Sequence, residues 1–151
     1  MVVSPRKGDM DGDFSHTLLD GRTGLPALLD ALEAYLGEAG APPPTVSAVM
    51  IAADEVLSNV VDYSGAGRVR VTATVRDGRV AVEVDDDGDP FDLTAAAAPD
   101  TTLSVDERAI GGLGIHLVRE LMEDVRYVRA GDANRLSFSR SYDLKSPSRQ
   151  P

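Results

Sequence analysis

The stretch RVRVTATVRDGRVAVEVDDDGDPFD, residues 68–92, decides the fold of this 151-residue chain. Apolar and polar residues alternate on both sides of Asp77-Gly78, a dipeptide typical of a two-residue hairpin turn. The alternation predicts two antiparallel strands, over residues 68–76 and 79–85, each with one apolar face to cover. Five aspartates within residues 85–92 predict an acidic turn at the end of a buried strand.

Helical patterns flank this hairpin. Leucines at helical spacing predict a helix over residues 25–36, and Thr45 is the expected N-cap of a second helix that reaches about Tyr63. A glycine cluster opens a third expected helix, from residue 111 to Met122. The other expected strands cover residues 14–19, 125–129 and 136–142. Short antiparallel strands with helices gathered on one face predict an α+β two-layer sandwich with a mixed, mostly antiparallel sheet.

Composition excludes several classes of protein. The 25 acidic and 15 basic side chains give a net charge of −10, which argues against nucleic-acid binding. The absence of Cys excludes disulfides, thiolate catalysis and Cys-ligated zinc. No apolar run approaches the roughly 20 residues of a membrane span, so we expect a cytoplasmic protein with no membrane contact. The polar ends, residues 1–12 and 144–151, are expected to be disordered tails around one domain at 13–143.

The second expected helix carries an unusual polar stripe. Glu55, Ser58, Asn59 and Asp62 are spaced to lie on one face, opposite the apolar side of the helix. A solvated surface is the usual explanation of such a stripe. This stripe has no Lys or Arg, however, and it sets a carboxylate and a carboxamide one turn apart. Such a pair is able to hold a hydrated Mg²⁺ and to orient a nucleophile.

The acidic turn and the glycine cluster each allow more than one interpretation. A calcium loop with Gly88 at its sixth position would end at Thr94, where a bidentate Glu is required, so the calcium pattern fails. A plain acidic turn remains open beside an aspartate that faces a ligand. Gly111-Gly112-Leu113-Gly114 precedes a helix, a natural phosphate site, yet it is neither a Walker A nor a Rossmann pattern and also suits a plain turn. His116 is expected to be structural.

Three motifs in order carry a resemblance over about residues 14–142. Asp54-Glu55-x-x-x-Asn59, Asp86-x-Gly88-x-Pro90-Phe91-Asp92 and Gly111-Gly112-Leu113-Gly114 resemble the N, G1 and G2 boxes of the GHKL (Bergerat-fold) ATPases. The Pro-Phe-Asp variant and the short lid over residues 92–110 are similar to those of anti-sigma-factor serine kinases of the RsbW-like group. The resemblance implies a histidine-kinase-like ATPase domain that uses ATP and Mg²⁺.

The resemblance also implies a role for each matched residue. Glu55 would be the catalytic general base toward the substrate serine, and Asn59 would bind the Mg²⁺ that bridges the ATP phosphates. Asp86 would accept a hydrogen bond from the exocyclic amine of adenine, and Gly88 would leave room for the ring. The other nucleotide contacts would come from Gly112, Gly114, the lid cation Arg108, and Ser137.

The activity implied by the resemblance is that of a protein serine kinase. Such a protein phosphorylates a serine of a STAS-type anti-anti-sigma partner, sequesters a sigma factor, and forms a homodimer. One alternative is a partner-binding switch module that binds ATP but is catalytically weak or inactive. Another is a kinase whose client belongs to a different partner-switching pathway, such as motility or secretion. The presence of Glu55 favours a kinase, because a pure binder needs no base there.

Overall fold

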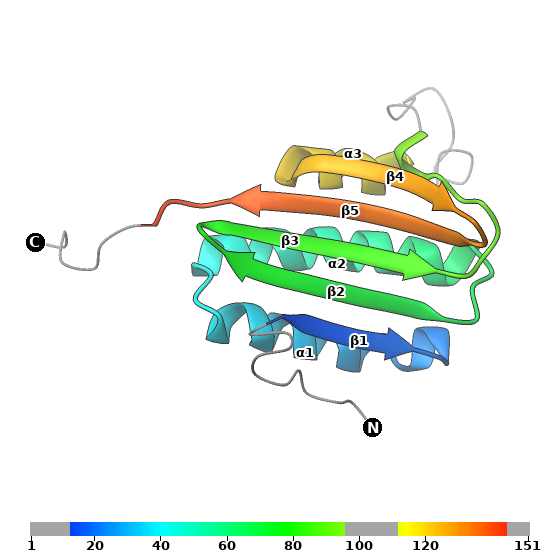
Figure 1. Cartoon of the computed structure of the whole chain (residues 1–151), viewed down its shortest axis with the longest axis horizontal. Coiled ribbons are helices and arrows are strands. Elements are labelled where there is room, and N and C mark those ends of the chain that lie inside the picture. Colours follow the sequence, from blue (N-terminus) through cyan, green and yellow to red (C-terminus); the bar gives the residue numbers. More distant parts are fainter. Residues whose placement is uncertain (1–12, 96–111, 145–151) are drawn as a thin grey trace, which may run out of the picture.

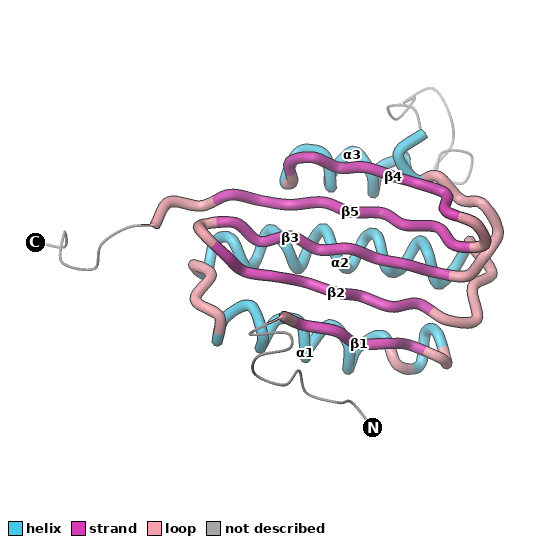
Figure 2. Tube along the Cα trace, in the orientation of Figure 1, coloured by secondary structure: helices cyan, strands magenta, loops and turns pink. Residues whose placement is uncertain are grey.

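The computed structural model describes residues 13–95 and 112–144, which form a five-stranded sheet with helices on one face (Figure 1 and Figure 2). The strands are β1 (Phe14–Leu18), β2 (Val69–Arg76), β3 (Arg79–Asp86), β4 (Glu123–Ala130) and β5 (Ala133–Ser141). The helices are α1 (Leu25–Glu38), α2 (Pro43–Tyr63) and α3 (Gly112–Leu121), with 3-10 turns η1 (Gly21–Thr23) and η2 (Leu93–Ala95). The expected α+β two-layer sandwich is confirmed.

The strands lie in the order β1-β2-β3-β5-β4. A mixed sheet was expected, whereas every pairing between the described strands is antiparallel. The last strand, β5, lies between β3 and β4, and its register sets Asn134 opposite Asp86 at the end of β3. Sheet order therefore brings together two polar residues that are far apart in the sequence.

Two tight turns set the register of the hairpins. Asp77 and Gly78 both have positive φ, 52° and 77°, as the turn between β2 and β3 requires. Gly131, with φ 61°, lies in the turn between β4 and β5. Both strands of this second hairpin begin earlier than their patterns predict, β5 by three residues and β4 by two. Polar and charged residues at the starts of β4 and β5 interrupt the apolar alternation there. In the β2–β3 hairpin that alternation is regular.

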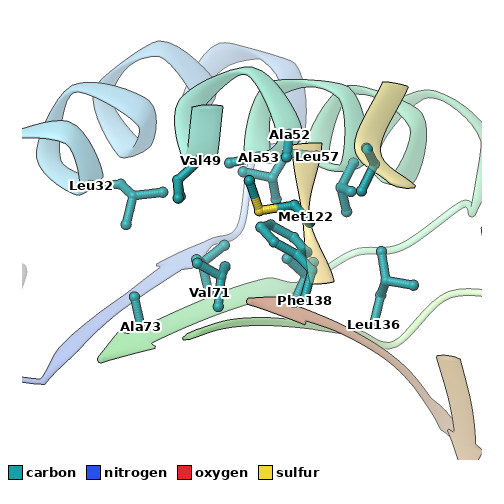
Figure 3. Packing of buried hydrophobic residues seen from close by; sticks show 14 of the residues in the cluster. Leu32, Val49, Ala52, Ala53, Leu57, Val71, Ala73, Met122, Leu136 and Phe138 are labelled. Carbon is teal, nitrogen blue, oxygen red and sulfur yellow. The ribbon is translucent and has the colours of Figure 1, made fainter. Parts of the chain in front are cut away.

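The core lies between the helices and the inner face of the sheet. Figure 3 shows Leu32 and Leu57 on the helix side, with Val71 and Phe138 facing them from the strands. Four of the five leucines in the pattern of α1 are buried and Leu29 is partly buried, because helical spacing sets them on one face. On α2 the buried face includes small residues, which allow the long helix to pack closely on its neighbours. These buried residues are Thr45, Ala48, Val49, Ala52, Ala53, Val56, Leu57 and Val60.

The start of α2 differs from its prediction. Thr45 was the expected N-cap, yet the helix begins at Pro43 and its N-cap is Pro42. Proline suits the first helical turn because the amide N–H that it lacks would have no partner within the helix. Thr45 therefore lies inside the first turn, only 4% exposed, and makes no cap.

By length and composition, α2 is also apolar enough to cross a membrane. Here it packs against α1 and α3 and over the sheet, so it is the core helix of this domain. The expected N-terminal tail lies outside the described residues, and so does the C-terminal tail apart from Leu144.

Candidate functional site

The polar stripe of α2 lies at the edge of the helix layer. Glu55, Ser58 and Asn59 are half-buried, and Asp62, at the end of the stripe, is exposed. The other side of the helix is buried in the core, so these side chains stand between the core and the solvent. A half-buried carboxylate and amide are accessible to a ligand and still partly screened from water.

Asn59 is held in place by its own helix. Its Nδ2 donates a 2.6 Å hydrogen bond to the carbonyl oxygen of Glu55, one turn earlier. Its Oδ1 accepts no hydrogen bond from any residue that the structure describes, and oxygen is the ligand atom that Mg²⁺ prefers. Within those same residues, no three His, Asp or Glu side chains are grouped to hold a metal. A Mg²⁺ at Asn59 therefore suits a site that phosphate and water complete.

A cation that the pattern of α2 did not predict reaches the stripe from η1. Arg22 Nη2 donates to both carboxylate oxygens of Asp62, at 2.6 Å each. The hydrogen bond with Asp62 and its charge raise the pKa of Arg22. Asp62 is thus committed to an ion pair, whereas Glu55 makes no ion pair with the described residues. Glu55 remains the carboxylate of the stripe that is available as a base.

Asp86 ends β3 as a buried carboxylate, 5% exposed. Its Oδ1 accepts hydrogen bonds from the backbone N–H of Gly88 at 2.8 Å and from Asn134 Nδ2 at 3.0 Å. Its Oδ2 accepts none from the described part of the chain. A buried carboxylate needs hydrogen-bond donors, so Oδ2 is positioned to accept one from a ligand.

Gly88 is required by the protein itself. A Cβ at this position would lie 2.3 Å from the carbonyl oxygen of Ser64 and 2.7 Å from its Oγ. The same carbonyl accepts a 2.9 Å hydrogen bond from the N–H of Asp89. Ser64 caps the end of α2, so this contact fastens the helix to the turn after β3. The glycine expected to leave room for a ring thus also allows two backbone segments to meet.

Asp87 holds the outer side of this turn. Its Oδ1 accepts hydrogen bonds from the N–H groups of Gly67 and Arg68, at 2.8 and 2.9 Å. These bonds, foremost the one from Arg68, stabilise the charged form and lower the pKa of Asp87. Asp87 is exposed, and it shapes the turn while its neighbour Asp86 is buried.

Asn134 is the residue of this site that the motifs missed. It is 3% exposed and faces Asp86 from β5. Its Nδ2 donates to Asp86 and to the carbonyl oxygen of Asp89, at 3.0 and 2.8 Å. Its Oδ1 accepts hydrogen bonds from the Phe91 N–H, the Tyr127 hydroxyl and Arg129. A strand register between residues 79–86 and 133–141 would have revealed it, but no local pattern carries that register.

The predicted nucleotide residues are only partly brought together. Glu55 and Asn59 lie on the helix whose end contacts the turn of Asp86 and Gly88. The rings of Tyr63 and Phe91 also approach across this junction, 6.4 Å apart between centroids. The third motif begins α3, which packs beside α2.

The glycine motif and the lid are described in part. Gly112 and Gly114 lie in the first turn of α3, where backbone N–H groups have no partner within the helix. Arg108 and Gly111 lie outside the described residues. A hydrogen bond connects α3 with η2, the two described elements on either side of this segment. Arg119 Nη2 donates it to the carbonyl oxygen of Thr94, at 2.6 Å.

Ser137 does not join the other predicted residues. It pairs with Glu83 across β3 and β5, an odd number of positions from the pair of Asp86 and Asn134. Its side chain therefore lies on the other face of the sheet, the open face, which carries no helices. There it lines an open pocket of about 400 Å³ with Thr72 and Thr74. Successive strand residues alternate faces, and the correction follows from that alternation. Asn134, three residues earlier, faces Asp86 instead.

Comparisons with known proteins agree with this fold. The family described as the histidine kinase-like ATPase domain matches residues 22–140. The serine/threonine-protein kinase BtrW of Bordetella bronchiseptica is 30% identical over 93 residues, 59% of this chain and 66% of that protein. This chain thus spans just under two thirds of that relative's length. The RsbU and RsbW domains of Rv1364c from Mycobacterium tuberculosis match with a TM-score of 0.59 at 18% identity, over 86% of this chain and 33% of that one. The match shows a shared fold.

Proposed function

This chain belongs to the histidine kinase-like ATPase domain family, and we propose that it is a protein serine kinase of the anti-sigma-factor type. Its substrates are ATP and a serine of a STAS-type anti-anti-sigma partner. The similarity to a serine/threonine kinase and to an RsbW domain supports this branch of the family. The observation that carries the proposal is Asp86, whose buried carboxylate keeps Oδ2 for a donor beyond the described residues.

Each side chain of the site has a task that its surroundings suit. Asp86 Oδ2 accepts a hydrogen bond from the exocyclic amine of adenine. Asn59 Oδ1 would hold the Mg²⁺ that accompanies the nucleotide, and the charge of this ion would offset that of the phosphates. Backbone N–H groups of Gly112 and Gly114 contact the phosphates at the start of α3. Arg108 is the proposed cation at the γ-phosphate.

Glu55 acts on the serine. Its carboxylate accepts the hydroxyl proton while the serine oxygen forms a bond to the γ-phosphorus, and the bond from that phosphorus to the β,γ-bridging oxygen breaks. The products are phosphoserine and ADP. Phosphoryl transfer depends mostly on positioning and charge stabilisation, so one free carboxylate beside the phosphates is sufficient.

The partners and the setting follow from the same branch. The unphosphorylated STAS protein is the substrate, and a sigma factor is the protein held inactive in its absence. A homodimer and a cytoplasmic location belong to this proposal as well. The net charge of −10 favours a basic surface on a protein partner over contact with nucleic acid.

The first experiment is isothermal titration calorimetry with ATP and Mg²⁺. Asp86→Asn and Asn59→Ala are each expected to lose most of the affinity of the wild type, by about tenfold or more. Asp85→Asn is the matched control, because Asp85 pairs with Arg135 on the open face of the sheet. Wild-type protein that binds no ATP would overturn the proposal.

The second experiment separates a kinase from a binding module. Glu55→Gln is expected to bind ATP like the wild type and to transfer no γ-phosphoryl group from radiolabelled ATP to a STAS-domain protein. The loss expected from removing a general base is about 10²- to 10⁴-fold in rate. Equal, very slow transfer by both proteins would support an ATP-binding switch without kinase activity.

A further inference from the structure

A cluster of polar contacts joins β4 to the turn after β3. Tyr127 and Arg129 lie two residues apart on β4, so both point to the helix-covered face of the sheet. Both donate to the same acceptor, Oδ1 of Asn134 on the neighbouring strand β5. Through these contacts the edge strand of the sheet reaches the carboxylate of Asp86.

Arg129 contacts both the turn after β3 and Asn134. Its Nη1 donates to the carbonyl oxygen of Gly88 at 2.8 Å and to Asn134 Oδ1 at 3.2 Å. The side chain is half-buried, and the turn that it contacts carries carboxylates at Asp86, Asp87 and Asp89. A cation at this point offsets the mutual repulsion of these carboxylates and adds a second contact to the turn beside that of Ser64.

The contacts leave Asn134 with one orientation. Three donors converge on its Oδ1, from Phe91, Tyr127 and Arg129, so the amide nitrogen must face Asp86. The nitrogen then donates to Asp86 Oδ1, which leaves Oδ2 as the oxygen that faces a ligand. Without those donors only two acceptors, Asp86 Oδ1 and the carbonyl oxygen of Asp89, hold the amide in this orientation, so the group is less firmly fixed.

We propose that Arg129 and Tyr127 are positioning residues that act through Asn134 to orient Asp86 and thereby set the preference for a purine with a 6-amino group. The proposal rests on the proposed recognition of adenine by Asp86. Neither β4 residue needs to touch the nucleotide. Each acts on the direction in which one carboxylate oxygen points.

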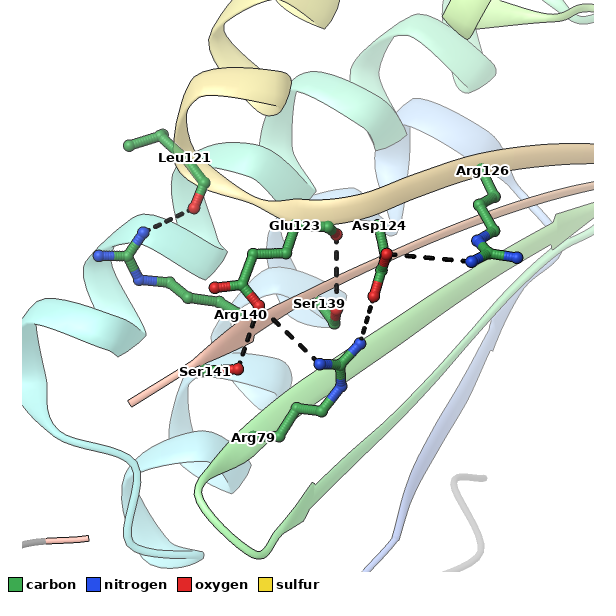
Figure 4. A network of polar contacts seen from close by, with 8 residues as sticks. All are labelled: Arg79, Leu121, Glu123, Asp124, Arg126, Ser139, Arg140 and Ser141. Carbon is green, nitrogen blue, oxygen red and sulfur yellow. Dashed lines mark hydrogen bonds and ion pairs between the residues drawn. The ribbon is translucent and has the colours of Figure 1, made fainter. Parts of the chain in front are cut away.

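The test compares two nucleotides, ATP and purine riboside triphosphate, which lacks only the 6-amino group. Their affinities are measured by calorimetry with Mg²⁺ for the wild type, Arg129→Ala and Tyr127→Phe. Tyr127→Phe removes a single hydroxyl and keeps the ring, so it tests the contact with little risk to folding. Arg126→Ala is the matched control, because Arg126 lies on the same strand and meets Asp124 on the open face (Figure 4).

Wild type is expected to bind ATP about 10- to 100-fold more tightly than purine riboside triphosphate. Arg129→Ala is expected to reduce this ratio by about tenfold, Tyr127→Phe to reduce it by less, and Arg126→Ala to leave it unchanged. A role in stability alone would weaken both nucleotides equally and leave the ratio at the wild-type value. That result in Arg129→Ala and Tyr127→Phe would overturn the proposal.

Asn134→Asp supplies an independent readout. It sets a second carboxylate against Asp86 at the 3.0 Å contact, and two carboxylates that share a site raise the pKa of one of them. ATP affinity relative to the wild type is expected to be lowest at pH 8 and to recover toward pH 5.5, as the pair takes up one proton. A loss of affinity that is the same at every pH would contradict the orienting role of the amide.

The outcomes separate this inference from the proposed function. If the wild type binds neither nucleotide, both the proposed function and the positioning role are overturned. A second outcome is that the wild type binds ATP and the preference for ATP is lost in Asp86→Asn. If Arg129→Ala and Tyr127→Phe keep that preference, only the positioning role of β4 is overturned.

Discussion

Gly88 shows what one missing side chain does for this molecule. The turn after β3 and the end of α2 meet there at backbone distance, and any Cβ would collide with the carbonyl of Ser64. Gly88→Ala is therefore expected to destabilise the fold by about 1–3 kcal/mol and to weaken ATP binding, because both segments must shift. Urea unfolding and calorimetry measure the two effects.

Gly37→Ala is the control for that substitution. Gly37 lies within α1, and a Cβ there would meet no atom within 4 Å. Alanine is the better helix former, so this variant is expected to gain about 0.5–1 kcal/mol. Equal stability of the two variants would show that the contact with Ser64 adjusts without cost.

Asp87 predicts a dependence of stability on pH. Its pKa is lowered in the folded protein, so its contribution is present above the unfolded pKa and is lost as pH falls through the folded pKa. The melting temperature of Asp87→Asn is expected to lie below that of the wild type near neutral pH. The two should converge in acid, below the ordinary range of a carboxyl.

The control is Asp132→Asn, which removes the same charge from the exposed turn between β4 and β5. It is expected to change the melting temperature near neutral pH by much less than Asp87→Asn does. A constant gap between wild type and Asp87→Asn down to the most acidic pH would assign the loss to packing and not to ionisation.

At the scale of residues, the sequence predicted what local chemistry determines. Asp86 stands out because it ends an apolar strand, and Glu55 and Asn59 stand out by helical spacing. Ser137 was expected at the nucleotide and Asn134 was given no role, because only the pairing of β5 with β3 decides which side chain faces Asp86. That pairing joins segments about 50 residues apart, and no local periodicity specifies it.

Among the elements, α2 depends on small side chains. Ala52 and Ala53 are fully buried, where the helix approaches Met122 and Phe138 (Figure 3). Ala53→Leu is expected to cost about 1–3 kcal/mol in unfolding free energy although leucine is a good helix former, because the added methyl groups have no space. Urea denaturation measures this cost.

Ala34→Leu is the matched control, since Ala34 lies on the exposed face of α1. The same side-chain change there is expected to alter stability by no more than about 0.5 kcal/mol. A small effect of equal size at both positions would contradict the prediction, because it would mean that the core beside Ala53 has space for a larger side chain.

The elements themselves were predicted to different degrees. The β2–β3 hairpin was evident from its alternation and from Asp77-Gly78. The start of α2 was misplaced because Pro43 and Pro44 form its first turn, which looks like a stiff connection in sequence. The strands β4 and β5 were predicted but shortened, because an edge strand with charges on its outer face has weak apolar alternation.

For the whole molecule, the sheet predicts a gradient of local stability. β1 and β4 are its two edges, and β3 has a partner on both sides. Amide hydrogen exchange is expected to be fastest in β1, intermediate in β4 and slowest in β3. The reason is that β4 is tied to β5 by a two-residue turn, whereas β1 has five residues and no such turn. Equal protection in β1 and β3 would contradict this order.

The order in which the chain is made gives the placement of β1 a consequence during synthesis. Leu18 pairs with Val69, so both α1 and α2 are translated between β1 and β2, its one partner among the described strands. At cellular rates of elongation, β1 waits on the order of several seconds as an unpaired segment with two apolar side chains, Phe14 and Leu18. β1 therefore leaves the ribosome well before the strand with which it pairs, and the nascent chain is open to misassociation in that interval.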